Sequence, residues 1–393
     1  MIKISLRPNL IYPIFLIIWT FLRKIISILI SKLFSFKGSV IYTFLMFLGE
    51  LIAGFSFYRY QENIIEEKSK KNDSKNTKYY KNISLIEVDS KIKRHDHIIK
   101  FVFLIFMTGS FDFFEFILST YYISKFHKIS GTLQTRLGGV LMIISSLLYW
   151  FLLKFQMFKH QIFSIIILVL SVIILIISEF LFQTFDMILT VENLSLVIFF
   201  SILSHMCVAF NNTIEKYLID FDFLNPLLLL SYQGIIGIFF TIICGIYENP
   251  FPALKNVYNN NSIGMFILFL VMLLFYTIFG ALKNVYRMFT IMLFTPMNKH
   301  LADISVNPIY IIYYFSMGED FKINDQINYF YFFLNLFLLI LFDICGLIFN
   351  EFLILLCCGL EFYTYRSISF RAETTIEMGD IFEPETDEQE TDE

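Results

Sequence analysis

The stretch Ile202–Ile238, ILSHMCVAFNNTIEKYLIDFDFLNPLLLLSYQGIIGI, places a group of polar side chains between two apolar runs. The polar group at the end of the first run consists of Asn211, Asn212, Glu215 and Lys216. A short acidic turn follows, and the second run begins at Pro226. Burying a carboxylate, an ammonium and two amides near hydrocarbon is costly unless these groups face a partner or a wet cavity. We therefore interpret the stretch as a functional element of a membrane protein.

Composition points to the same class. The chain has 393 residues, of which 57% are hydrophobic and 16% charged, and its mean hydropathy is +0.67. Apolar runs of roughly 20 residues recur along the chain, which is enough for a helix to cross a ~30 Å hydrocarbon core. A soluble protein would need more polar surface. The sequence therefore predicts an all-α integral membrane protein.

Ten apolar runs are interpreted as spans, at about 10–30, 39–58, 101–122, 131–153, 162–182, 194–212, 226–247, 263–286, 301–315 and 329–358. The first run contains Arg23 and Lys24. A helix lying in the membrane interface is therefore the open alternative to a first crossing.

Two segments outside the runs lack hydrophobic periodicity. Residues 59–100 are rich in Lys, Asn, Glu and Ser, and the chain after Arg371 has ten Asp or Glu and no Lys or Arg. Both compositions are typical of disordered, solvated chain. The expected organisation is two helices in 1–58, a disordered basic cytosolic loop in 59–100, helices three to five in 101–182, a second five-helix half in 183–363 and an acidic disordered cytosolic tail in 364–393.

Lys and Arg in the loops predict the orientation. With ten spans both ends lie on one side, and the loops of that side carry more Lys and Arg, chiefly in the loop after the second span. Basic residues favour the cytosolic side. We expect both termini to be cytosolic in an integral, multi-pass protein of either an endomembrane or the plasma membrane.

Five spans followed by five of similar spacing suggest an internal duplication. An odd number of spans per half places the two halves in opposite orientations, and transporters of this design bind substrate near the midplane between the halves. The expected fold is ten transmembrane helices as two inverted five-helix halves.

Four motifs follow one another along these spans. They are MFLGE at Met46–Glu50, LQTRLGGVLMI at Leu133–Ile143 after a third span that holds Asp112, NNTIEKYLIDFDFLNP at 211–226 and TPMNKHLADISVNP at 295–308. Together they resemble the drug/metabolite transporter superfamily, and most closely its nucleotide-sugar-transporter-like solute carriers and their orphan relatives. The resemblance covers about residues 11–363. It implies ten helices in two inverted halves, cytosolic termini and alternating access to a central cavity.

Two positions depart from the pattern of those relatives. Relatives tend to have Gln-x-x-Arg-Gly at the start of the fourth span, whereas here Arg136 comes one residue earlier. A step of one residue rotates a side chain by about 100° on a helix, so the resemblance does not carry a cavity-facing position over to Arg136. Relatives also tend to have Glu-Gly in the seventh span, where this chain has Gln233-Gly234 and one charge fewer.

Carboxylates inside the spans are the first candidate site residues. Glu50 lies deep in its apolar run, where it could pair with a cation, relay a proton or hydrogen-bond to a neighbouring helix. Asp112 and Glu115 are three residues apart and share a helix face. They suit proton coupling or a cationic group on a substrate, and hydration near a membrane surface is the alternative.

The fourth span adds an amide and a base near its start. Gln134 and Gly138 share a face, and Arg136 lies close by. Arg136 could clamp an anionic phosphate or carboxylate, neutralise one of the acids or extend to the membrane interface.

The sixth span carries a polar stripe made of Asn211, Asn212 and Glu215. The amides suit hydrogen bonding to a polar solute. Because this end of the span is expected to be cytosolic, Glu215 or Lys216 could close a gate, and a solvated helix end is the alternative.

The later spans carry two further polar stripes. On the ninth span, Asp303 and Asn307 follow Lys299 at four-residue spacing. A face of the eighth span could attract an anionic solute or simply anchor the helix on the cytosolic side, and its residues are Gly280, Lys283, Asn284 and Arg287.

Enzyme signatures are missing, since the six histidines show no HxxxH or HExxH spacing and there is no phosphate loop of the GxxxxGK[ST] type. We therefore expect neither an enzyme nor a bound metal or cofactor. The first hypothesis is a secondary transporter that moves a small organic solute, anionic or zwitterionic, by alternating access. The second is a non-transporting membrane scaffold or trafficking protein that works through its cytosolic loop and tail.

The expected partners are the lipid bilayer and a small-molecule solute, with a proton or a counter-substrate as the coupled species. No nucleic acid is expected, and a homodimer is an open alternative.

Overall fold

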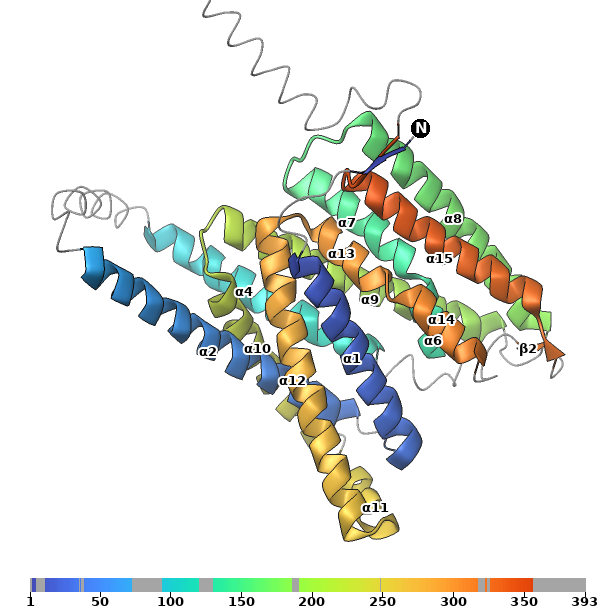
Figure 1. Cartoon of the computed structure of the whole chain (residues 1–393), viewed down its shortest axis with the longest axis horizontal. Coiled ribbons are helices and arrows are strands. Elements are labelled where there is room, and N and C mark those ends of the chain that lie inside the picture. Colours follow the sequence, from blue (N-terminus) through green and yellow to red (C-terminus); the bar gives the residue numbers. More distant parts are fainter. Residues whose placement is uncertain are drawn as a thin grey trace, which may run out of the picture.

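The structure is a computed structural model that describes residues 2–4, 11–34, 36, 39–72, 94–119, 130–185, 191–247, 249–316, 322–323 and 326–355. Most of these residues are helical (Figure 1). The helices are α1 (Ile11–Phe34), α2 (Ser39–Asn72), α4 (Arg94–Ile117), α6 (Ser130–Arg136), α7 (Gly138–Leu152), α8 (Lys159–Phe185), α9 (Val191–Asp220), α10 (Pro226–Tyr247), α11 (Phe251–Asn260), α12 (Ile263–Leu293), α13 (Pro296–Ile304), α14 (Asn307–Ser316) and α15 (Tyr329–Phe349).

Two short antiparallel strand pairs accompany the helices. Strand β1 (Ile2–Ile4) pairs with β4 (Leu353–Leu355), and β2 (Lys322–Ile323) pairs with β3 (Gln326–Ile327). The first pair brings the start of the chain next to the segment that follows the last helix.

Seven helices of the described chain are long and apolar enough to cross a membrane, namely α1, α2, α8, α9, α10, α12 and α15. They support the predicted α-helical, multi-pass membrane protein, whereas ten crossings and two inverted halves stay a prediction. Helix α1 runs without interruption through Arg23 and Lys24 and is one of the seven. Its strongly apolar composition favours a crossing over a helix that lies in the interface.

The other three expected spans look different from simple crossings. The third corresponds to α4, which carries Asp112 and Glu115. The fourth is split at Leu137 into α6 and α7, where a Gly138-Gly139 pair weakens the helix. The ninth is split between Ile304 and Asn307 into α13 and α14, because Pro308 has no amide hydrogen to bond one turn back.

Both ends of the expected loop 59–100 are helical, whereas its middle and the tail lie outside the described residues. Helix α2 continues to Asn72 and α4 already begins at Arg94. Only 73–93 of the expected disordered loop is thus outside the described chain, and so is the acidic tail at 364–393.

Glycines let α2 and α10 pack closely. An added Cβ at Gly54 would lie 2.6 Å from the Ser231 hydroxyl oxygen, and one at Gly234 would lie 2.6 Å from the backbone nitrogen of Leu51. Small residues of this kind are common where membrane helices approach each other. In the same part of the molecule, α1 lies along α12 (Figure 1).

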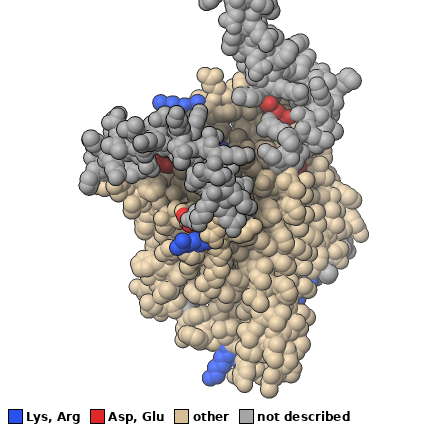
Figure 2. Space-filling model, turned by 60° about the vertical axis from the view of Figure 1, so that its left-hand side comes forward, with Lys and Arg blue, Asp and Glu red and all other residues tan. Residues whose placement is uncertain are grey.

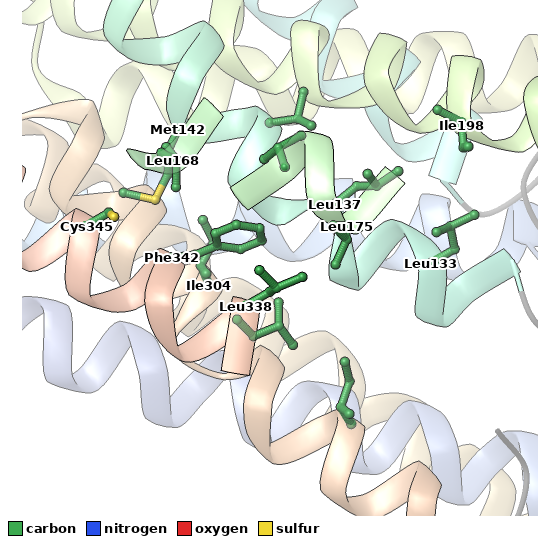
Figure 3. Close-up of a cluster of buried hydrophobic side chains, with 14 of the residues drawn as sticks. Leu133, Leu137, Met142, Leu168, Leu175, Ile198, Ile304, Leu338, Phe342 and Cys345 are labelled. Carbon is green, nitrogen blue, oxygen red and sulfur yellow. The ribbon is translucent and has the colours of Figure 1, made fainter. Parts of the chain in front are cut away.

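An apolar core holds the other side of the bundle together, between α6, α7, α8, α9 and α15. Figure 3 shows Leu338 and Phe342 on the side of α15 that faces Leu137 and Leu175. Leu137, Leu175 and Phe342 are fully buried. The spacing of Leu338 and Phe342 by one helical turn is what places both side chains in this core.

The outer surface is mostly apolar. Figure 2 shows one face of the molecule, most of which carries neither acidic nor basic side chains. Large apolar side chains such as Phe151, Phe239 and Phe330 are 74%, 58% and 67% exposed. Such a surface is unfavourable in water and suits contact with lipid.

Candidate functional site: a charged cavity between the helices

A cavity of about 320 Å³ lies between helices from both ends of the chain. This volume is at the lower end of the range for small-molecule sites, roughly 300–1,000 Å³. Unlike most such sites it is strongly polar. Its ionisable and amide lining residues are Arg23, Lys24, Glu50, Asp112, Glu115, Gln134, His205, Asn211, Lys283, Asn284, Arg287, Lys299, Asp303 and Asn307.

The cavity brings together most of the residues singled out from the sequence. Those that line it are Glu50, Asp112, Glu115, Gln134, Asn211, Asp303 and Asn307. They come from α2, α4, α6, α9, α13 and α14, so the fold gathers groups that are up to 257 positions apart, from Glu50 to Asn307 (307 − 50). Arg136, Asn212 and Glu215 do not line it.

The basic lining residues were largely left out of the sequence-based site. Lys283, Asn284 and Arg287 occupy one face of α12, and Arg23 and Lys24 lie near the middle of α1. The sequence did contain an indication that these bases line a site, because a pair of bases inside an apolar run is costly unless it faces a polar interior. The sequence alone does not say towards which neighbour that helix face turns.

Arg287 is the central buried cation of the site. Its Nη1 lies 3.7 Å from Asp112 Oδ1 on α4, and its Nη2 lies 3.3 Å from Glu215 Oε1 on α9. Nη2 also donates to Gln233 Oε1 at 3.0 Å. One guanidinium therefore ties α12 to three neighbouring helices, which suits its planar set of five donors.

Gln233 completes this network from α10. Its Nε2 donates to Glu215 Oε1 at 2.7 Å and to Asn211 Oδ1 at 3.3 Å. The departure from the Glu-Gly pattern thus places a neutral amide against Arg287 and Glu215. An amide can accept from the one and donate to the other, which a carboxylate could not do.

Three bases of the cavity have no salt bridge to any described residue. Arg23 donates to the Tyr276 hydroxyl at 2.8 Å, and Lys24 approaches the Thr135 hydroxyl at 3.4 Å and lies 3.7 Å from the centre of the Tyr310 ring. No hydrogen bond or salt bridge joins Lys283 to the described chain. We call Arg23, Lys24 and Lys283 the basic wall.

Carboxylates of α2 and α4 form an acidic wall made of Glu50, Asp112 and Glu115. Asn284 on α12 donates to Glu50 Oε1, while Glu50 Oε2 and Asp112 Oδ2 are buried without a hydrogen-bond partner in the described chain. Glu50 is only 1% exposed. A buried carboxylate oxygen without a partner costs free energy, so a hydrogen-bond donor that reached these oxygens would stabilise the wall.

The breaks in the two split helices meet beside the cavity. Asn307 Nδ2, at the start of α14, donates to the Thr135 carbonyl at 2.9 Å, just before the break at Leu137. A Cβ on Gly138 would lie 3.0 Å from Asn307 Nδ2 and 3.2 Å from Ile304 Cγ1. One turn earlier, Lys299 and Asp303 form an ion pair at 2.8 Å.

Buried polar contacts fill the layer between the cavity and the end of α9. Asn212 is fully buried and lies 3.5 Å from His300 Nε2, which is 2.7 Å from the Ser145 hydroxyl. Lys216 Nζ reaches the Met292 carbonyl at 3.2 Å and Asp220 at 3.1 Å. These contacts join α9 to α12 and α13, and α13 to α7.

Arg136 points away from the cavity into a separate cluster. Its Nη1 lies 2.7 Å from Glu179 Oε1 on α8 and donates to the Tyr331 hydroxyl on α15 at 2.6 Å. Tyr331 in turn donates to Glu179 Oε2 at 2.6 Å. Arg136 is 1% exposed, so it neither contacts the cavity nor extends to the membrane interface.

A scan with protein-family models finds no match to the chain, and a search of curated proteins finds no similar sequence.

Proposed function

We propose that this chain is a secondary-active membrane transporter that moves a small polar organic solute by alternating access. The observation that carries the proposal is the charged cavity between α1, α2, α4, α9, α12 and α13. Ionisable residues inside a membrane domain are expensive and are retained chiefly where they bind or conduct a solute.

The two split helices support this proposal. In many transporters the substrate site is formed by interrupted helices at corresponding positions of two repeated halves. Here α6–α7 and α13–α14 would be the fourth and ninth of ten spans, five positions apart, and their breaks adjoin the cavity through Gly138 and Asn307.

Helix packing supports two related halves. Counted as ten spans, α1, α2, α4, α6–α7 and α8 would correspond to α9, α10, α12, α13–α14 and α15. If each helix is replaced by its counterpart, one packed pair becomes another packed pair. Helices α1 and α12 become α9 and α4, and α2 and α12 become α10 and α4. Helices α7 and α9 become α13 and α1. The pairs α2–α10, α8–α15 and α7–α13 map onto themselves. Five spans in each half would make the repeat inverted, in keeping with the resemblance to the drug/metabolite transporter superfamily.

The contacts of Lys216 near the end of α9 support a role for a gate. The expected orientation makes the ends of α9 and α12 cytosolic, where Lys216 bonds to the Met292 carbonyl and Asp220. Opening on that side would require breaking these contacts, and the described state would then be the one closed to the cytosol.

The proposal is tested by counterflow in proteoliposomes made with the purified full chain. Vesicles loaded with one unlabelled solute class at a time should accumulate the labelled solute, and classes to include are amino acids, nucleotide sugars, nucleotides, small peptides and polyamines. We expect Glu50→Gln and Asp112→Asn to abolish the flux while the purified proteins stay monodisperse. Glu192→Gln, which removes an exposed carboxylate at the start of α9, is the matched control and should retain the flux. Normal flux in both cavity variants would remove these residues from the site.

A further inference from the structure

The charges of the cavity balance when its inner layer is included. The lining contains five bases, on α1, α12 and α13, and four acids, on α2, α4 and α13. A fifth acid, Glu215, lies directly behind Arg287 at 3.3 Å. In their ionised forms these groups sum to zero, so a solute with a net charge would leave an uncompensated charge in a low-dielectric interior.

The charges of the cavity cancel as a sum, but not every charged group has a salt-bridge partner of its own. Lys299 is paired with Asp303, and Arg287 with Glu215 and Asp112. The whole basic wall, and Glu50 and Glu115 of the acidic wall, have no salt bridge in the described chain. The basic wall therefore has unused N–H donors, and the acidic wall contains the buried oxygens Glu50 Oε2 and Asp112 Oδ2, which have no hydrogen-bond partner in the described chain.

We propose that the solute of this cavity is a small zwitterion, with an anionic group that binds to Arg23, Lys24 and Lys283 and a protonated amine that binds to Glu50, Asp112 and Glu115. This inference rests on the proposed transporter function and names its substrate class. A zwitterion satisfies both walls at once and leaves the summed charge at zero. A monoanion would satisfy the basic wall and leave the carboxylate oxygens without a donor.

The first test uses four forms of the same compound. Amino acids with uncharged side chains and taurine, all of zero net charge at neutral pH, are screened by thermal unfolding of the purified full chain and by counterflow. For each amino acid that binds, the N-acetyl acid, the amide and the N-acetyl amide are then compared with the free amino acid. We expect the free amino acid to bind at least about tenfold more tightly than each derivative, because the N-acetyl acid and the amide each lose one charge-assisted interaction and the N-acetyl amide loses both. An N-acetyl acid or a nucleotide that binds as tightly as the free amino acid would overturn the proposal.

The second test shifts the charge of the cavity in both directions. Glu115→Gln makes the cavity positive by one and should favour the N-acetyl acid relative to the free amino acid. Lys283→Gln makes it negative by one and should favour the amide. Exposed positions provide matched controls, Glu192→Gln and Lys255→Gln, and these should leave the preference unchanged. A shift in the same direction for both cavity variants, or no shift in either, would contradict the proposal.

The failure of this inference can be told apart from the failure of the proposed function. Counterflow of an anion or a polyamine but of no zwitterion would overturn the substrate class and leave the transporter proposal standing. Counterflow of no solute from any class would count against the transporter proposal itself.

Discussion

Two buried charge clusters of this protein differ in one respect. The cluster of Arg136, Glu179 and Tyr331 is closed, since each of the three groups bonds to both others at 2.6–2.7 Å and none of them lines the charged cavity. The central cluster surrounds a cavity, and several of its charged groups have no salt-bridge partner in the described chain. The first arrangement holds α6, α8 and α15 together, whereas the second leaves binding capacity for a solute.

Burial of a charge does not by itself identify a functional residue. Arg136 is as deeply buried as Glu50, at 1% exposure for each. The two residues differ in whether other groups of the protein satisfy the hydrogen bonds that their side chains can form. Substitutions should therefore affect stability at the closed cluster and transport at the open one.

The largest loss of stability is expected for Arg136→Met, because it leaves Glu179 buried without its cation. Breaking a buried ion pair by removing one partner costs about 3–5 kcal/mol, which can be measured by unfolding with SDS. The double variant Arg136→Met/Glu179→Leu should recover most of the loss, because no isolated charge remains. A double variant as unstable as the single one would show that the ion pair does not hold these helices together.

A smaller loss is expected at the helix contact that supports the open cluster. Gly234→Ala would bring a methyl group to 2.6 Å from the backbone of Leu51, next to Gln233, which holds Arg287. Overpacking of this kind costs about 1–3 kcal/mol, again measured by SDS unfolding. Gly264→Ala is the matched control, since no atom lies within 4 Å of its added Cβ. Equal stability of the two variants would contradict close packing between α2 and α10.

No loss of stability is expected for Glu115→Gln and Lys283→Gln, the neutral variants of the open cluster. Each removes a charge that has no salt bridge in the described chain, so the folded state loses no partner and the desolvation cost falls. Their unfolding midpoints should equal or exceed that of the unchanged protein while counterflow falls. Destabilisation as large as that of Arg136→Met would mean that both clusters are structural.

Part of this arrangement could be predicted from the sequence. Apolar runs predicted the helices that could cross a membrane, and polar residues within them predicted Glu50, Asp112, Asn211 and Asp303 as members of one polar region. The one-residue shift at Arg136 gave reason to doubt that it faces the cavity, and Gln134 and Gly138, one helical turn apart, line the cavity while Arg136 does not.

The other contacts of the site could not be predicted, because they depend on which neighbour each helix face turns towards. In the sequence, Arg23 and Lys24 left an interfacial helix as the alternative to a first crossing. An apolar run does not reveal that α1 packs along α12. The partner of Arg136 could not be predicted either, since Glu179 lies two helices further along the chain, on α8. The breaks at Leu137 and Ser305 were not predicted, although Gly138-Gly139 and Pro308 mark them in the sequence.

The central claim is that the cavity opens to both faces of the membrane and is occupied by the solute. The direct measurement is labelling of Asn211→Cys with a membrane-impermeant maleimide in proteoliposomes, after replacement of the five native cysteines. Asn211 lines the cavity, whereas Ser178 is buried on α8 away from it and provides the control Ser178→Cys. The account predicts labelling of Asn211→Cys from either face, protection by saturating transported solute and no labelling of Ser178→Cys. Labelling of Asn211→Cys from neither face, or labelling that saturating solute leaves unchanged, would contradict it.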